Sequence, residues 1–259
     1  MIDQEILLGL TQAGIAAALV LAVTLLARTR AIHMEREVVI ALIRGLVQIV
    51  AVGSILVLLL QGPGFTSIFI LLAMMLAAAT IAARRARGIQ DAFKVSLYGI
   101  SVGSGLVIAL MTALGVIDVE MTSLIPLGSM LIANAMNSNA LALDRFKGEI
   151  QSHTGEIEAG LALGADPKVV VTPYVRAAVH ASMIPRVDTL RSLGIVWIPG
   201  VMAGMVLAGS DPVYAAIYQF VVIAMIFASS ALTSLVSTLL IRSRAFSPAE
   251  QLILRKVPR

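Results

Sequence analysis

The chain has no cysteine among its 259 residues, so disulfide bonds and thiolate metal sites are excluded. Charged residues are scarce at 13%, whereas a soluble domain has about a quarter. Hydrophobic residues instead make up 59% of the chain, and its mean hydropathy is +0.96. This composition indicates an integral membrane protein.

The long apolar runs lack acidic residues and histidine, and this absence argues against a proton-coupled transporter. A proton-coupled carrier needs an ionisable relay inside the bilayer, because the proton must rest on a side chain. The chain also lacks the P-loop pattern G-x-x-x-x-G-K-[ST], so it cannot bind ATP in that way by itself. No catalytic constellation assembles either. We therefore expect a transport subunit that is not an enzyme and that takes any energy for uphill movement from a partner.

Seven apolar runs are long enough to cross the roughly 30 Å hydrocarbon layer as helices, which takes about 20 residues each. We expect an all-α protein with a single transmembrane domain over residues 1–259. The first run is expected to be a true span, because its basic flank follows the run, the reverse of a cleavable signal. The expected spans are Ile6–Ala27, Val38–Leu60, Phe65–Ala83, Val95–Ile117, Ser123–Leu143, Leu193–Ala208 and Val213–Ile241.

Basic residues are distributed unequally between the two sides of this seven-span arrangement. All 19 Lys and Arg fall on one side, and the connections on the other side carry only acidic residues such as Asp118 and Asp211. By the positive-inside rule, the N-terminus is expected outside and the C-terminus in the cytosol. The net charge of +4 is dispersed beside apolar spans, so it indicates contact with lipid headgroups and no nucleic-acid binding.

One connection, residues 144–191, is much longer than the others and too polar to span. Its pattern predicts short cytosolic helices. Gly164 is a helix stop, Asp166-Pro167 and Thr172-Pro173 are helix starts, and Pro185 interrupts or restarts the last helix. We expect this loop to be the cytosolic element that contacts a partner.

Polar side chains inside the expected spans are candidates for a translocation path. Arg44 and Gln48 share one helical face of the second span, where a packing or gating role competes with simple snorkelling of the guanidinium. Met130, Asn134 and Asn137 share one face of the fifth span. Two roles are open for these three residues: they form ordinary interhelical hydrogen bonds, or they line a pathway with weak amide and thioether ligands.

Glycine pairs four residues apart predict close helix approach at two places. Gly99 and Gly103 belong to a G-x-S-x-G pattern, which we interpret as helix packing because no histidine lies in a span. Gly200 and Gly204 form the second pair. Met202 and Met205 beside them either line the path or fill space in the interior.

The segment from Glu158 to Gly164 resembles the E-A-A-x-x-x-G loop of bacterial ABC importer permeases, in which a short helix docks on the ATPase. Leu161 and Leu163 supply the apolar side chains that such a docking element needs. The continuation expected in importers is missing, since Tyr174 stands in its place.

Several longer motifs are spread over nearly the whole chain. They are Arg44-Gly-Leu-Val-Gln48, Pro126-Leu-Gly-Ser-Met130, Asn134-Ala-Met-Asn137, Leu163-Gly-Ala-Asp-Pro167, Ile184-Pro-Arg-Val-Asp188, Gly194-Ile-Val-Trp-Ile-Pro-Gly200-Val-Met-Ala-Gly204, Gly209-Ser-Asp-Pro212 and Tyr218-Gln219. In these motifs the chain resembles the FetB-type permeases, a family that includes a bacterial iron exporter subunit and plant aluminium-tolerance proteins. Ala133 and Trp197-Ile198 depart from the usual pattern of that family, and both could reshape a substrate path.

The resemblance implies a permease subunit of an ABC exporter in the plasma (inner) membrane, forming a homodimer and pairing with separate P-loop ATPase chains. ATP and Mg would be bound by those partners, and no cofactor by this chain. The implied cargo is iron or a related divalent metal; a sugar nucleotide, or a passive or sodium-coupled carrier, are the alternatives. Coupling is expected through Glu158, Leu161, Leu163 and Gly164, together with Pro185 and Asp188.

Overall fold

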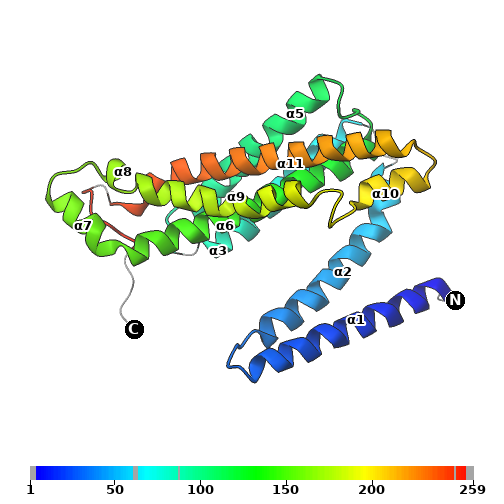
Figure 1. Ribbon diagram of the computed structural model, residues 1–259, viewed down its shortest axis with the longest axis horizontal. Coiled ribbons are helices and arrows are strands. Elements are labelled where there is room, and N and C mark those ends of the chain that lie inside the picture. Colours follow the sequence, from blue (N-terminus) through cyan, green and yellow to red (C-terminus); the bar gives the residue numbers. More distant parts are fainter. Residues whose placement is uncertain (1–3, 61–63, 87, 248, 255–259) are drawn as a thin grey trace. The chain divides into compact units, whose positions relative to one another are not determined.

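The computed structural model describes residues 4–60, 64–86, 88–247 and 249–254, and these are almost entirely helical (Figure 1). The described residues contain two isolated β-bridges and no strand. The expected all-α fold is confirmed for this part of the chain. Gly62 and Pro63, which belong to an expected external turn, lie outside the described residues.

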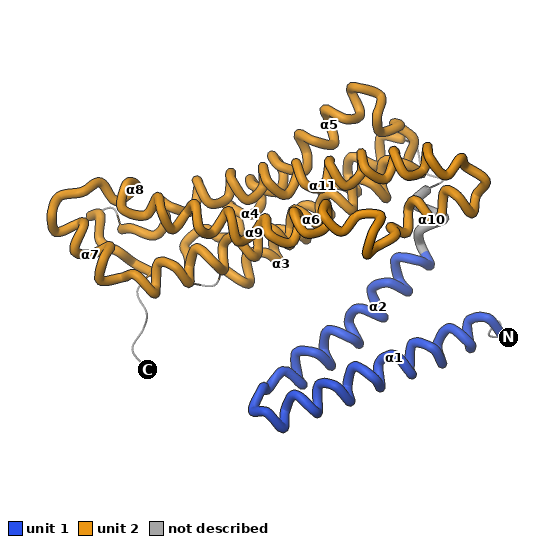
Figure 2. The backbone as a smooth tube through the Cα atoms, viewed as in Figure 1, with its two compact units in different colours: residues 1–62 blue, residues 63–259 orange. Residues whose placement is uncertain are grey.

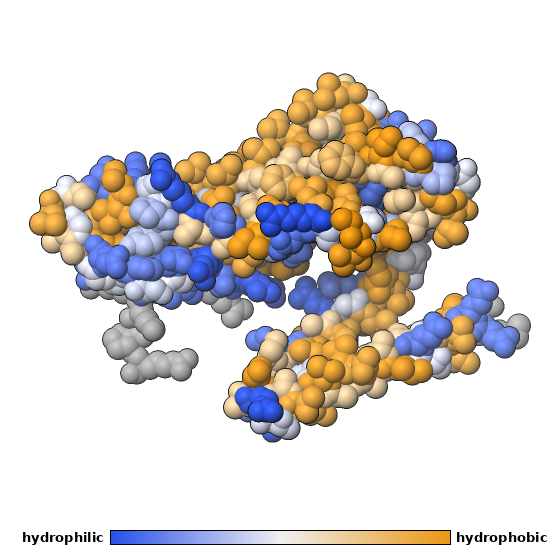
Figure 3. Space-filling view, viewed as in Figure 1, coloured by the Kyte–Doolittle hydropathy of each residue, from blue (hydrophilic) through white to orange (hydrophobic). Residues whose placement is uncertain are grey.

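The chain divides into two compact units, residues 1–62 and 63–259 (Figure 2). The first unit is a hairpin of α1 (Gln4–Arg28) and α2 (Glu35–Leu60). Thr24 is its one buried residue among the described side chains, and an apolar groove of about 610 Å³ runs between its helices. Two helices that are apolar and exposed on nearly every face match a lipid surrounding, and their visible face is mostly hydrophobic (Figure 3).

The second unit is a helical bundle. It contains α3 (Thr66–Arg85), α4 (Ala92–Ile100), a π turn (Ser101–Gly105), α5 (Leu106–Ala113), α6 (Met121–Ser152), α7 (Thr154–Ala162), α8 (Pro167–Val170), α9 (Thr172–Ser192), α10 (Gly200–Leu207) and α11 (Pro212–Ile241), followed by a 3₁₀ turn (Arg242–Ala245).

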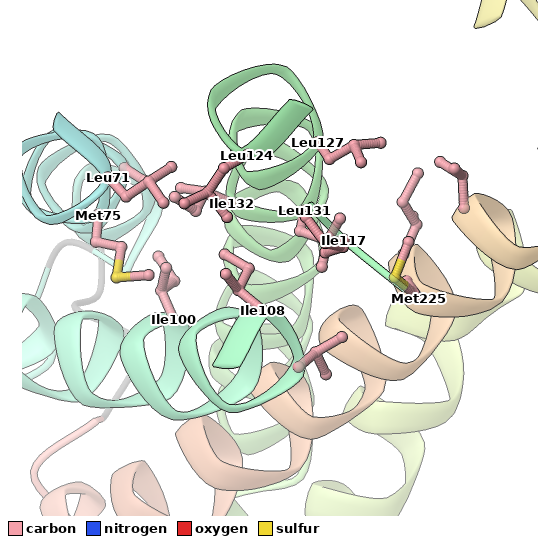
Figure 4. Close-up of a cluster of buried hydrophobic side chains, with 14 of the residues drawn as sticks. Leu71, Met75, Ile100, Ile108, Ile117, Leu124, Leu127, Leu131, Ile132 and Met225 are labelled. Atoms are coloured by element: carbon pink, nitrogen blue, oxygen red, sulfur yellow. The ribbon is translucent and has the colours of Figure 1, made fainter. Parts of the chain in front are cut away.

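Two apolar clusters hold this bundle together. The first joins α3, α5, α6 and α11, and Leu71, Ile108, Leu131 and Met225 are among its members (Figure 4). The second includes Phe146, Ile157 and Val175, and a C-terminal turn adds Leu252 and Leu254 to it. The α6 helix contributes to both clusters and packs against α3, α9 and α11, so it lies at the centre of the bundle.

Five helical segments in the described chain are long and apolar enough to cross a membrane. They correspond to the expected first, second, third, fourth and seventh spans. The α6 helix is not among them, although it has 32 residues, because Asn134, Asn137 and Asn139 make its middle less apolar.

The expected continuous helix over Leu193–Ala208 is wrong. Residues 193–199 form a turn in which Gly194 has φ +77 and its N–H donates to the Trp197 carbonyl at 3.1 Å. Pro199 precedes α10, which has only eight residues and is about 12 Å long at 1.5 Å per residue. An element this short cannot span the bilayer alone.

The last loop helix, which we expected Pro185 to interrupt or restart, is instead one 21-residue helix, α9, which runs through Pro185 without a break. It packs against α6 and α11, and α9 and α10 follow one another along the length of α11 (Figure 1). Its buried face is made of Val175, Ala178 and Ser182, small side chains that allow close approach. The predicted starts at Asp166-Pro167 and Thr172-Pro173 and the stop at Gly164 are confirmed.

The glycine pair in α4 and the π turn packs directly on α11. A Cβ added to Gly103 would lie 2.6 Å from the Thr233 nitrogen and 2.8 Å from the Ser229 carbonyl oxygen. A Cβ on Gly99 would meet the Ser237 side chain. The interpretation of G-x-S-x-G as helix packing is therefore confirmed.

Candidate functional site

The predicted polar face of α6 is present, and its members differ in burial. Met130 and Asn134 are half-buried, whereas Asn137 is exposed. The Asn134 amide Nδ2 donates to the Met130 carbonyl at 2.8 Å, which leaves its Oδ1 directed at a neighbouring helix. This part of α6 thus presents amide groups beside α9.

Arg186 of α9 is the neighbour that sequence reasoning missed. Its Nη1 donates to Asn134 Oδ1, and its Nε donates to Ser138 Oγ at 3.3 Å. Asn134 lies one residue from the midpoint of the expected fifth span. Arg186 was counted among the basic residues of the cytosolic side, yet it contacts the middle of α6. The signal available in the sequence was the small-residue face of α9, which indicates a packed helix.

A row of hydroxyl groups along α11 forms a second polar feature that the sequence analysis did not single out. All six side chains are fully buried, and they recur in pairs four residues apart: Ser229, Ser230, Thr233, Ser234, Ser237 and Thr238. The Ser182 hydroxyl of α9 donates to Ser234 Oγ at 3.0 Å. Ser182 and Arg186 lie one turn apart on α9, so polar contacts connect α9 to both α6 and α11.

The candidate methionines lie on α10, which packs against α11. Met202 and Met205 are both half-buried. Buried Gln219 of α11 accepts a hydrogen bond from the Met202 backbone N–H at 3.2 Å. This contact satisfies one of the N–H groups that a helix start leaves free, so Gln219 fixes the beginning of α10.

Arg44 and Gln48 lie on α2 in the first unit, and both are exposed within it. The groove between α1 and α2 is lined from α2 by Val38, Ala41 and Gly45 among others, and neither candidate lines it. Their predicted place on a shared helical face holds within α2, and their role stays a prediction.

The predicted coupling residues around α7 form a projecting tip. Leu163 is 89% exposed, whereas Leu161 packs partly against the second apolar cluster. Glu158 is half-buried on α7, and Gly164 ends the segment with φ +83. Of the two leucines, Leu163 is the one free to contact another protein.

The C-terminal turn lies beside this tip. A polar groove of about 410 Å³ lies between Leu161, Gly164 and Pro167 on one side and Glu250 on the other. The adjacent start of α9 is fixed by Tyr174, which stacks on His153 at 4.8 Å and donates to Glu156 Oε2 at 3.1 Å. Burial, and then this hydrogen bond, raises the pKa of the Tyr174 phenol, so the bond persists at neutral pH.

Pro185 and Asp188, the other predicted coupling residues, do not lie at the tip. Pro185 is 13 residues along α9 from Thr172, a rise of about 20 Å. Asp188 is exposed and lies 4.0 Å from Arg191. The structure therefore joins the tip to the Pro185–Asp188 segment through the length of one helix.

The described residues contain no group of three or more His, Asp or Glu side chains able to hold a metal ion. The polar groups that converge are amides, hydroxyls and one guanidinium. Such a set can make directional hydrogen bonds across α6, α9 and α11, but it offers no negative charge.

Comparison with known proteins identifies the family. The family model described as "Uncharacterised protein family (UPF0014)" matches residues 10–246. The chain belongs to the UPF0014 family. No solved structure matches the chain. The suspected resemblance to FetB-type permeases is confirmed.

UPF0014 relatives match along most of their length. The chain is 28% identical to "Probable iron export permease protein FetB" of Escherichia coli over 96% of this chain and 97% of the relative. It is 35% identical to the UPF0014 membrane protein slr1647 of Synechocystis over 81% and 83%. "Protein ALUMINUM SENSITIVE 3" of Arabidopsis thaliana is 27% identical over 94% and 90%. Together with the five apolar helices, the UPF0014 assignment makes this chain a multi-pass membrane protein.

Proposed function

We propose that this chain is the permease subunit of an ABC-type exporter for iron or a related divalent metal. Two copies would pair with separate ATPase chains that bind ATP and Mg. The proposal is supported by the UPF0014 relative named as an iron export permease and by the absence of a P-loop in this chain.

The observation that carries the proposal is the tip around Leu163. An apolar side chain that is 89% exposed, directly after the short helix α7, is suited to docking in a groove of another protein. Ile157 beneath it is fully buried in the second apolar cluster with Phe146 and Val175. A displacement of the tip would therefore move α6 and α9 with it.

The α9 helix provides the route from the tip to the polar face. It begins beside α7 and α8, and 14 residues later it contacts Asn134 through Arg186. Packed helices move as rigid elements. In this mechanism, closure of the ATPase chains pushes the tip, and α9 carries the movement to the amide groups of α6.

The test is a substitution at Leu163 in the complex purified with its ATPase chains and reconstituted in lipid. Leu163→Asp should reduce stimulated ATP hydrolysis to the basal rate and weaken co-purification, while the melting temperature stays within about 2 °C of wild type, since exposed positions change stability little. Leu163→Met, which keeps the apolar side chain, is the matched control and should retain hydrolysis.

Leu161→Asp is a poorer test, because Leu161 packs partly against the apolar cluster and its substitution would also damage folding. Unchanged stimulated hydrolysis in Leu163→Asp would refute the coupling role of the tip. Uphill transport by the reconstituted chain without any ATPase partner would refute the proposed function as a whole.

A further inference from the structure

Arg186 is a cation in the middle of the bundle that has no acidic partner among the described residues. Its two polar contacts are neutral, the Asn134 amide and the Ser138 hydroxyl. Within the described ranges, no carboxylate oxygen forms an ion pair with its guanidinium. A charge taken partly out of water is normally paired, so this arrangement needs a reason.

The helices packed around Arg186 carry few acidic residues, and each of these lies away from the Arg186 guanidinium. Asp188 follows Arg186 by two residues, about 200° around α9, and lies next to Arg191. On α6, Glu149 pairs with Arg145 at 3.0 Å, and Asp144 is exposed ten residues beyond Asn134. The α11 sequence from Pro212 to Ile241 contains no acid.

The guanidinium also keeps hydrogen-bonding capacity. It has five N–H donors, and the contacts with Asn134 and Ser138 use two of them. The remaining donors form a planar fork whose geometry matches carboxylate and phosphate groups. Asn137, exposed one turn along α6 from Asn134, adds an amide donor on the same helix.

We propose that Arg186, positioned by Asn134 and Ser138, binds an oxyanion group of the transported solute. This inference rests on the proposed function and specifies the form of the cargo: a metal passes this point inside an anionic carboxylate or phosphate complex, because a bare divalent cation would be repelled. The same chemistry would accept a phosphorylated organic solute. Both sources present an oxyanion to the guanidinium, and the experiment separates them.

Binding is measured by titration calorimetry on the purified permease in detergent, without the ATPase. The probes are ferrous ion alone, citrate, ferric citrate, inorganic phosphate and a nucleoside diphosphate hexose. We expect at least one oxyanion probe to bind, and ferrous ion alone not to bind at this site. Tighter binding of ferric citrate than of citrate indicates a chelated metal, whereas preference for the nucleotide sugar indicates a phosphorylated solute.

Three variants assign the binding to Arg186. Arg186→Gln keeps a hydrogen-bonding side chain but loses the charge and should weaken binding more than tenfold. Arg186→Lys keeps the charge without the fork and should weaken it about three- to tenfold. Arg176→Gln, at an exposed position of the same helix, is the control and should leave affinity unchanged.

The inference is overturned if no oxyanion probe binds, or if both Arg186 variants bind like wild type. If Arg186→Gln fails to fold, Arg186→Lys still decides, because unchanged affinity in that variant excludes use of the fork. If the binding experiment fails but Leu163→Asp still abolishes stimulated ATP hydrolysis, the proposed ATPase-coupled permease is unaffected. If binding depends on Arg186 but the chain stimulates no ATPase, the proposed function is refuted and the anion site is retained.

Discussion

Two glycine pairs with the same spacing behave differently in this molecule. Gly99 and Gly103 lie against α11 so closely that a single added carbon would collide with it. Gly200 and Gly204 of α10 have no described atom within 4 Å of an added Cβ. Among the described residues of the second unit, the expected close helix approach at Gly200 and Gly204 is not found. Spacing identifies a face that permits close approach, and a partner helix must then occupy it.

The nature of the opposing surface explains the difference. Opposite Gly99 and Gly103, α11 presents Ser229, Thr233 and Ser237, small hydroxyl residues one turn apart. They leave room for a backbone to approach. The side of α10 that carries Gly200 and Gly204 does not face α11.

The largest effect is expected for Gly103→Ala. The new methyl group would lie 2.6 Å and 2.8 Å from backbone atoms of α11, which cannot rotate away. We expect a loss of about 3 kcal/mol in unfolding free energy, at the upper end of the cost of overpacking. Thermal melts and detergent unfolding measure it.

The companion variant Gly103→Ala/Thr233→Ala should not recover this stability, because the backbone contacts remain. Full recovery in the double variant would show that only the Thr233 side chain was in the way.

An intermediate effect is expected for Gly99→Ala, where the obstacle is mainly a side chain. The nearest group is the Ser237 hydroxyl, followed by Ser237 Cβ at 3.1 Å. Gly99→Ala should cost about 1–2 kcal/mol. Gly99→Ala/Ser237→Ala should restore most of this loss, since the buried Ser237 hydroxyl has no hydrogen-bond partner among the described residues. A double-mutant cycle by thermal unfolding gives the coupling; strictly additive losses would contradict the proposed contact.

The smallest effect is expected for Gly204→Ala, and it has the opposite sign. In an open helical position, alanine should add up to about 1 kcal/mol to the unfolding free energy. The same melts on the isolated permease measure it. A loss comparable to that of Gly103→Ala would show that this face of α10 is covered in the assembled protein, and the contrast between the two pairs would then disappear.

The sequence predicted the strongly apolar helices well, because hydropathy reports directly on long runs that face lipid. The expected Phe65–Ala83 and Val213–Ile241 are α3 (Thr66–Arg85) and α11 (Pro212–Ile241). The sequence analysis did not predict that α9 packs against α6 and α11, because a helix enclosed by neighbours need not be apolar all round. Ala178 and Ser182 give α9 a packing face that a hydropathy scan does not detect.

The candidate site was predicted in part for a similar reason. The shared face of Met130, Asn134 and Asn137 follows from helical periodicity within one segment. The pairing of Asn134 with Arg186 joins residues 52 positions apart, and no local pattern encodes it. The resemblance to the E-A-A-x-x-x-G loop treated Leu161 and Leu163 alike, whereas only the packed structure shows that Leu163 projects and that Leu161 packs partly against the second apolar cluster.

The π turn at Ser101–Gly105 has a consequence for the length of the chain. A π turn closes its hydrogen bonds over five residues where an α-helix uses four, so it accommodates one residue more than the helix around it. Deleting one residue there would regularise the helix, and we expect α4 and α5 to stay in their places when it is lost.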